Sequence, residues 1–353
     1  MKILFLDHPY HKITNSSNFF IDIMKRFGEI EFIYIDPHNF NDLNYIMNVN
    51  LSEYKLVVLW QLDYFAPFFL GKGIKCIVVP MYDASGSFDQ IHWIAMNGSL
   101  VVCFCLHLYR LVAMAGNRCV YVKYFPEIIG EPSYIFKFNS NFDLHPSVFL
   151  WERRPDSKIN AFNIINRVKG IKWLHIHQVP DPGFEPTDLN KIESNIKITT
   201  SNWFPDKVTY LKEISKHDFF IAPRYTEGIG LSFLEAMAMG IPVIASDLPT
   251  HNEYILNYKN GILINFFNDE MIIDLSDISI DKLNDFKQNT YYMSKNLRTL
   301  WIDYYEKLLI DSIKEYLEDY VHLTPFDYDL SYLSLAHIKP DEYYLYLKKN
   351  LRR

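Results

Sequence analysis

Two glutamates, Glu227 and Glu235, stand eight positions apart and enclose the segment Gly228-Ile229-Gly230-Leu231-Ser232. Glycines let backbone N–H groups approach a ligand closely, and the first turn of a helix carries partial positive charge. The amides and the serine hydroxyl of this segment therefore suit a phosphate group, and Glu235 could accept hydrogen bonds from ligand hydroxyls. In the alternative interpretation, Glu227 only complements the helix dipole and Glu235 is solvated, but neither role requires both glycines.

The elements around this segment predict a β-α-β unit. Residues 219–223 form an apolar run of strand length. Residues 231–239 are good helix formers, and Gly240 and Pro242 follow as stop signals. A second apolar run at 242–246 completes the unit. Because ligands bind at the carboxyl ends of strands in parallel sheets, the loop between the two glutamates is expected at such an edge.

This combination resembles the E-x7-E signature of GT-B nucleotide-sugar glycosyltransferases, especially the retaining family 4-like group. Residues 227–235 read like EGFGLxxxE, residues 240–246 like G-x-P-V-I-A-S/T, and residues 260–264 like the later N-G-hydrophobic hairpin. The match covers roughly residues 203–265 well and the rest in outline. It implies an α/β GT-B fold of two Rossmann-like domains with a cleft between them. It also implies that Glu227 faces the donor sugar and that Glu235 binds the ribose.

A second part of the resemblance concerns two cations. The family carries G-R-L-x-x-x-K-G near the start of its second domain, and Arg153 and Lys158 keep the spacing of its Arg and Lys. Glu152 and Ile159 replace the two glycines of that pattern. Fixed cations would stabilise the charge that a leaving nucleoside diphosphate gains. The alternative is a solvated basic turn, and Arg154 could take the place of Arg153 in contacting the diphosphate.

Three further candidates follow from position in the chain. Asp83 follows the predicted strand 76–80, near the point where the family often has a histidine that contacts sugar. Asp83 is therefore a candidate to bind or deprotonate the acceptor hydroxyl, although a turn-forming aspartate is equally consistent. Trp203 and Phe204 precede the helix that leads into the main motif, where family members often hold the base, and an aromatic ring could stack on it.

A bound metal is not expected. The four cysteines lack a second Cys or His pair for a zinc pattern and are read as buried free thiols. His175 and His177 share one face of a predicted strand, but no carboxylate stands at ligand spacing in the sequence. No Asp-x-Asp follows a strand, and the cations and loop amides already supply positive charge. We therefore expect no cofactor and no metal.

Bulk properties restrict the partners and the location. The chain has 353 residues and a formal charge of −7, so net charge does not suggest a nucleic-acid partner. No apolar run reaches the roughly 18 residues of a membrane helix, and the N-terminal run is too short for a signal peptide. A cytoplasmic location is expected.

Four basic residues follow the apolar and aromatic positions 343–347: Lys348, Lys349, Arg352 and Arg353. This pattern is compatible with peripheral docking on the inner membrane or with burial against the first domain.

Alternating strands and helices predict two domains and a tail. We place an N-terminal, acceptor-side domain at 1–145, a nucleotide-sugar-binding domain at 146–320, and a tail at 321–353 that could pack back on the first domain. A linker is expected at 136–146. The predicted strands lie at 2–6, 31–35, 56–60, 76–80, 100–105, 119–124, 148–151, 172–177, 196–199, 219–222, 243–245 and 261–264.

The resemblance implies a glycosyltransferase of bacterial polysaccharide biosynthesis. It would move a sugar from a nucleotide-diphosphate sugar to a glycan or lipid-linked acceptor, with retention of configuration. Two alternatives stay open: a sugar-nucleotide epimerase of the same fold, and a non-catalytic partner subunit that binds a second transferase. The sequence does not identify the base, the sugar, the acceptor, the linkage or the oligomeric state.

Overall fold

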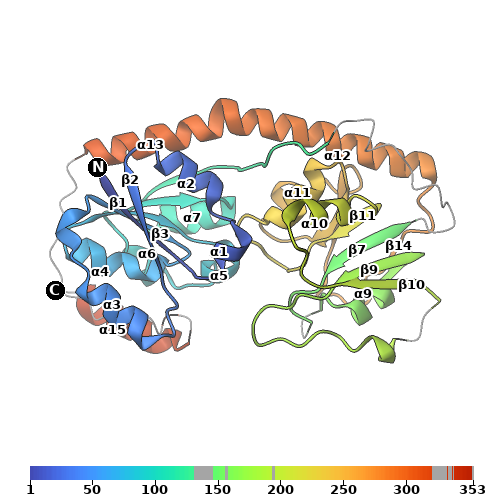
Figure 1. Cartoon of the computed structure of the whole chain (residues 1–353), viewed down its shortest axis with the longest axis horizontal. Helices are drawn as coiled ribbons and strands as arrows, with labels where there is room; N and C mark the ends of the chain where they lie inside the picture. The colour runs from blue at the N-terminus through green and yellow to red at the C-terminus, as the bar shows by residue number, and fades with distance from the viewer. Residues whose placement is uncertain are drawn as a thin grey trace. The chain divides into compact units, whose positions relative to one another are not determined.

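The computed structural model describes residues 1–130, 146–155, 158–192, 195–319, 332, 336 and 338–351. Its contacts divide the chain into two compact units (Figure 1). Unit 1 comprises Met1–Lys123 and Asp303–Arg353, and unit 2 comprises Tyr124–Ile302. Each unit contains one parallel six-stranded sheet. The α/β fold class predicted from the alternating pattern is therefore present twice.

The sheet of unit 1 has the strand order β2-β1-β3-β4-β5-β6. The central strands consist almost wholly of buried apolar residues because both faces of a parallel sheet are covered. The strands are β1 (Lys2–Asp7), β2 (Glu29–Tyr34), β3 (Leu56–Trp60), β4 (Lys75–Val79), β5 (Leu100–Cys103) and β6 (Arg118–Tyr121). The helices are α1 (His11–Thr14), α2 (Asn18–Met24), α3 (Phe40–Asn48), α4 (Ala66–Gly71), α5 (Tyr82–Ser85), α6 (Gln90–Ile94), α7 (Leu106–Met114), α13 (Glu306–Glu318) and α15 (Pro340–Leu351), with short 3-10 turns η1 (Leu51–Glu53) and η2 (Asp63–Phe65).

Two late helices complete unit 1. The Lys75 ammonium donates to the carbonyl oxygens of Tyr316 at 2.9 Å and Leu317 at 2.7 Å, where α13 ends. A cation at a helix C-terminus satisfies terminal carbonyls and complements the helix dipole. On α15, Tyr343 and Leu347 are buried in the apolar core of unit 1. The Tyr343 hydroxyl lies 2.7 Å from His92 Nδ1 on α6. The predicted tail residues Arg352 and Arg353 lie outside the described residues.

The sheet of unit 2 has the strand order β10-β9-β7-β11-β12-β13. Its strands are β7 (Ser147–Trp151), β9 (Trp173–His177), β10 (Lys197–Ser201), β11 (Phe219–Ile221), β12 (Val243–Ser246) and β13 (Gly261–Ile264), and a two-stranded ladder joins β8 (Val168–Lys169) to β14 (Ile273–Asp274). Its helices are α9 (Ala161–Arg167), α10 (Lys207–Ile214), α11 (Leu231–Ala238) and α12 (Ile280–Leu300), with the 3-10 turns η4 (Leu189–Lys191) and η5 (His251–Glu253). The π-helical turn η6 (Trp301–Tyr305) follows α12 and includes the point after Ile302 where the chain is divided. The β-α-β unit expected around the two glutamates is β11-α11-β12.

The units divide at different positions from the predicted domains. The sequence places boundaries after residues 145 and 320, whereas the contacts divide the chain after Lys123 and after Ile302. Residues just after β6 explain the first difference, because they bond to unit 2. The Tyr254 hydroxyl donates to the Tyr124 carbonyl at 2.8 Å, and the Ile129 amide donates to the Ala238 carbonyl at 3.1 Å. Most of the predicted linker at 136–146 lies outside the described residues.

The described residues give two further findings about partners and surfaces. No helix among them is both long enough and apolar enough to cross a membrane. All four cysteines are free thiols, and Cys76, Cys103 and Cys105 are buried, as the sequence predicts, while Cys119 is partly exposed. Burial raises the pKa of the Cys103 thiol well above its usual range, so this group is not poised for thiolate chemistry.

Candidate active site

The loop between β11 and α11 is shaped by one glycine. Gly230 has φ +75° and immediately precedes α11. A Cβ atom built at Gly230 would lie 2.0 Å from the Phe233 ring, so both the backbone angle and the space exclude a larger residue. Because a glycine has no side chain to cap the helix, the first N–H groups of α11 remain available to a ligand.

The rest of the loop is fixed from β12. Thr250, which follows β12, donates its hydroxyl to the carbonyl oxygens of Glu227 at 2.7 Å and Gly228 at 3.1 Å. Gly228, Ile229 and Gly230 are buried, while the first helical residues Leu231 and Ser232 are partly exposed. The loop thus has a buried, fixed backbone and a partly exposed helix start, which is the arrangement that a phosphate site requires.

Both glutamates of the motif are buried. Glu227 is 6% exposed and Glu235 is 7% exposed, so the interpretation of Glu235 as a solvated residue is wrong. The Lys207 ammonium, from the first residue of α10, lies 2.5 Å from Glu235 Oε1. Burial raises the pKa of Glu235, and the charge of Lys207 opposes that rise. A buried carboxylate costs free energy unless partners compensate it, and Lys207 is such a partner for Glu235.

The two arginines after β7 bind one carboxylate. Arg153 donates from Nε and Nη2 to Asp181 Oδ1 at 2.9 and 2.7 Å, and Arg154 donates from Nε to Asp181 Oδ2 at 3.0 Å. Burial would raise the pKa of Asp181, but the charges of Arg153, Arg224 and Arg154 lower it. The carboxylate is therefore ionised and is surrounded by more positive than negative charge. The sequence reasoning missed Asp181 and Arg224, although Arg224 lies just past the end of β11.

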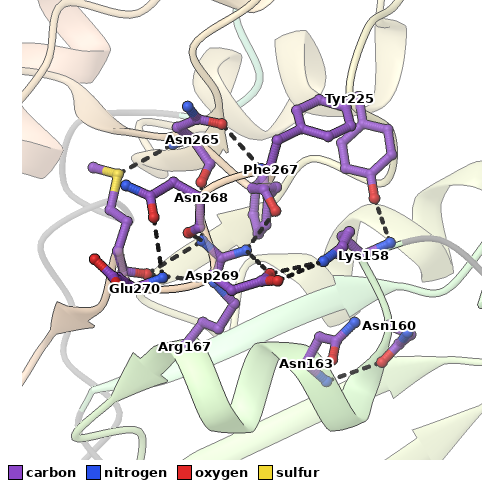
Figure 2. Close-up of polar contacts among 12 residues, drawn as sticks. Lys158, Asn160, Asn163, Arg167, Tyr225, Asn265, Phe267, Asn268, Asp269 and Glu270 are labelled. Atoms are coloured by element: carbon purple, nitrogen blue, oxygen red, sulfur yellow. Dashed lines mark hydrogen bonds and ion pairs between the residues drawn. The ribbon is translucent and has the colours of Figure 1, made fainter.

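Lys158 is held by different partners (Figure 2). Its ammonium lies 2.8 and 2.9 Å from the two oxygens of Asp269, and its backbone amide donates to the Tyr225 hydroxyl. Arg167 braces the loop that carries Asp269 by donating to the carbonyls of Phe266 at 2.6 Å and Asn265 at 2.9 Å. The structure thus fixes Arg153 and Lys158 through separate carboxylates rather than through one shared partner.

The contacts of Glu152 explain why this residue replaces the first glycine of the pattern G-R-L-x-x-x-K-G. The side chain is fully buried. It accepts hydrogen bonds from the Ala161 amide at 3.0 Å and the Thr187 hydroxyl at 2.6 Å through Oε1, and from the Thr187 amide at 3.1 Å through Oε2. A carboxylate at the first residue of α9 complements the helix dipole. Glu152 therefore anchors both α9 and the loop that contains Asp181.

The two predicted stacking residues differ in exposure. Trp203 is 55% exposed, whereas Phe204 is partly buried and stacks on His177 with ring centres 4.9 Å apart. The ring of Tyr210, from α10, lies 5.8 Å from Phe204. Because Phe204 already has ring neighbours, Trp203 presents the more accessible aromatic face at this point.

Asp83 is the one predicted site residue in unit 1. It lies in the first turn of α5, directly after β4, and is partly exposed. A cluster that the sequence reasoning did not select lies in the same unit at the end of β1. Asp7 Oδ1 pairs with His11 Nδ1, and Asp7 Oδ2 accepts from the Ser17 hydroxyl at 2.9 Å. A carboxylate at the last residue of a parallel strand is the sequence signal that could have identified this cluster.

Comparisons with known proteins match parts of the chain to glycosyltransferases. Residues 187–292 match the family described as glycosyl transferases group 1. A 107-residue stretch is 28% identical to the UDP-N-acetylglucosamine–peptide N-acetylglucosaminyltransferase GtfA subunit of Limosilactobacillus reuteri subsp. suis, covering 26% of this chain and 21% of that protein. A 49-residue stretch is 43% identical to the lipopolysaccharide core biosynthesis mannosyltransferase LpsB of Rhizobium meliloti, covering 13% of this chain and 14% of that protein. The matches thus span well under two thirds of either relative.

The fold has solved counterparts. The structure of HepE from Anabaena in complex with UDP matches with a TM-score of 0.59 at 17% identity, covering 90% of this chain and 99% of that chain. The chain has the GT-B fold, which confirms the predicted fold class. The family match covers α10, α11 and the loop between the two glutamates.

Proposed function

We propose that this protein is a glycosyltransferase that moves a sugar from a nucleotide-diphosphate sugar to an acceptor hydroxyl. The observation that carries the proposal is the pair of buried glutamates, Glu227 and Glu235, around the left-handed glycine that opens α11. Neither helix capping nor solubility explains two buried carboxylates beside an uncapped helix start. A ligand that carries both phosphates and hydroxyls does explain them, and a nucleotide sugar is such a ligand.

Each group of the donor has a counterpart in unit 2. The amides of α11 and the Ser232 hydroxyl would hold phosphate oxygens, and Glu235 would accept from the ribose hydroxyls. Trp203 would stack on the base. The complex of HepE with UDP favours uridine as that base.

The cations would act on the leaving group. As the glycosidic bond breaks, negative charge grows on the diphosphate, so fixed positive groups stabilise the transition state more than the ground state. Arg153 and Lys158 would supply this charge, with Arg154 and Arg224 beside Asp181. Asp181 and Asp269 hold these cations in place and would share them with the diphosphate. In this scheme the bond-breaking step uses protein cations and backbone amides and requires no divalent metal.

Retention of configuration is part of the proposal. The acceptor would attack the face that the diphosphate leaves, and the leaving phosphate would take the acceptor proton. No protein nucleophile is then required, so Glu227 would bind and orient the donor sugar. The acceptor would be a glycan or a lipid-linked glycan, as the mannosyltransferase relative named for lipopolysaccharide core biosynthesis suggests. Asp83 remains the candidate to contact the acceptor hydroxyl.

A thermal-shift panel of UDP-, GDP-, ADP- and CMP-sugars tests the donor class. A ligand at about 100 times its dissociation constant adds about 2.7 kcal/mol of stability. We expect UDP-sugars to raise Tm, and the corresponding free sugars to leave it unchanged. Failure of all four classes to shift Tm would contradict the proposal. Binding followed by epimerisation without acceptor would favour the epimerase alternative, and binding without any turnover would favour a partner subunit.

A further inference from the structure

Three potential metal ligands meet between β9 and the end of α10. His175 lies in the middle of β9, Glu213 lies in the last turn of α10, and His217 follows that helix. Glu213 Oε1 is 3.7 Å from His175 Nδ1 and 3.8 Å from His217 Nε2. One ligand atom from each residue lies within 4.8 Å of the other two, and in the part of the chain that the structure describes no other group of His, Cys, Asp and Glu meets this geometry.

The buried state of His217 points to a missing ligand. Its side chain is 0% exposed, and among the described residues neither ring nitrogen has a hydrogen-bond partner. At 3.8 Å, Glu213 is too distant for a hydrogen bond. Buried polar atoms are normally satisfied, because leaving one without a partner costs about 1–3 kcal/mol. A cation between Glu213 and His217 would satisfy one of these nitrogens.

The chemistry of the group suits a metal ion. Two imidazoles and one carboxylate form a donor set that divalent transition metals take in proteins.

The ring of His175 is already oriented. Its Nε2 lies 2.9 Å from the Ser201 hydroxyl and its Nδ1 lies 2.9 Å from the Thr199 hydroxyl. If Nε2–H donates to Ser201, Nδ1 carries a lone pair that faces Glu213 and accepts from Thr199 in the absence of metal. Such hydrogen bonds from the second ring nitrogen commonly fix the tautomer of metal-bound histidines.

We propose that His175, Glu213 and His217 form a structural site for a divalent transition metal ion, with zinc as the best match. Zinc takes two histidines and one carboxylate at about 2.0–2.2 Å, which places tetrahedral ligand atoms about 3.4 Å apart. The observed distances from Glu213 Oε1 to His175 Nδ1 and His217 Nε2 exceed this ligand-to-ligand spacing by only a few tenths of an ångström. Lys216 pairs with the other oxygen, Oε2, which leaves Oε1 for the metal.

The proposed site would hold α10 in place and would not contact the sugar. It would fix the C-terminal end of α10 to β9, while Lys207 at the other end of α10 pairs with Glu235. In the sequence, His175 and His177 have no carboxylate at ligand spacing. Folding supplies Glu213 from the last turn of α10 and His217 from just after that helix, and local spacing in the sequence could not reveal this.

Cobalt binding tests the site. The full chain is treated with EDTA, freed of any polyhistidine tag and titrated with Co²⁺, whose visible absorption reports tetrahedral coordination. We expect one Co²⁺ per chain, displaced by Zn²⁺. Glu213→Gln and His217→Ala should abolish this stoichiometric binding, and Ser201→Ala should weaken it about 10–100-fold. His38→Ala removes an exposed histidine from unit 1 and should leave binding unchanged.

Circular dichroism separates loss of metal from loss of fold. Because Glu213 is partly exposed, Glu213→Gln should fold even if His217→Ala does not. Zn²⁺ should raise Tm of the EDTA-treated wild type but not of folded Glu213→Gln. No stoichiometric binding by the wild type, or equal affinity in folded Glu213→Gln, would overturn the proposal. Neither result depends on turnover, so the test is independent of the proposed function.

Discussion

Glu227 and Glu235 are carboxylates that the fold keeps out of water, and their positions predict different roles. Glu235 lies within α11 and is paired with Lys207, whereas Glu227 lies in the loop before the helix. We therefore expect Glu235→Ala to weaken nucleotide binding by removing the acceptor of the ribose hydroxyls. Glu227→Gln keeps the shape and one acceptor oxygen, so it should lower turnover about 10–100-fold while nucleotide affinity stays nearly intact.

Calorimetry with the free nucleoside diphosphate, together with turnover assays, checks this pair of variants. The nucleotide lacks the sugar, so it reports the Glu235 contact without the Glu227 contact. Loss of nucleotide binding in Glu227→Gln with normal binding in Glu235→Ala would reverse the two assignments.

His251 predicts a pH dependence of stability. It is fully buried beside Ser246 and Phe233, and burial lowers its pKa to about 3, only partly opposed by a hydrogen bond with the Tyr225 backbone. In the unfolded chain the pKa of histidine is about 6.5. Between these values only the unfolded chain binds the proton, so the free energy of unfolding falls as pH decreases from about 6.5 towards 3.

The contribution of His251 amounts to at most about 1.4 kcal/mol per pH unit in that window. Urea unfolding of the wild type and His251→Gln at pH 7 and pH 5 measures it. The variant should lose less stability than the wild type over this interval. An equal loss in both proteins would show that His251 is not the titrating group.

At the scale of elements, the start of α11 depends on Gly230. Alanine would have to adopt a left-handed φ, at about 1–2 kcal/mol, and its Cβ would meet the Phe233 ring, which is held between His251 and Tyr254. Gly73→Ala is the matched control, since Gly73 has φ +77° and open space around it. We expect urea unfolding to show a larger loss for Gly230→Ala, accompanied by loss of nucleotide binding. Similar losses in both variants would remove the steric argument.

Helix α15 tests the interpretation of the basic tail. Tyr343 and Leu347 are buried in the core of unit 1, so they are not available to insert into a bilayer. We therefore expect the double variant Lys348→Glu/Lys349→Glu to sediment with anionic vesicles as the wild type does. A selective loss of sedimentation in the variant would support peripheral membrane docking instead.

The sequence predicted the elements better than their tertiary partners. Strands β3 and β13 were predicted residue for residue, because each is an apolar run between turn signals. The π-helical turn η6 between α12 and α13 has no signal in the sequence, since such a turn changes hydrogen-bond partners and not residue types. Asp181, which binds both arginines, comes from a loop after β9. Local spacing could not reveal that contact.

At the scale of the whole molecule, the chain has the GT-B fold, and the proposed donor site lies in unit 2. The family match covers residues 187–292, which include α10, α11 and the loop between the two glutamates.

The metal dependence of turnover is informative at this scale. Turnover should continue in EDTA, because the proposed bond-breaking step uses protein cations. Full loss in EDTA restored by Mg²⁺ or Mn²⁺ would contradict that step, whereas restoration by Zn²⁺ alone would point to the site on α10.

The most direct test of the central claim is product analysis by NMR. The full chain is incubated with each UDP-sugar that binds and with glycan or lipid-linked acceptors, and both the released nucleotide and the new linkage are identified. We predict release of nucleoside diphosphate together with a glycosidic product that has the anomeric configuration of the donor. An inverted product would contradict the retaining mechanism, and donor binding without transfer to any acceptor would contradict the assignment as a glycosyltransferase.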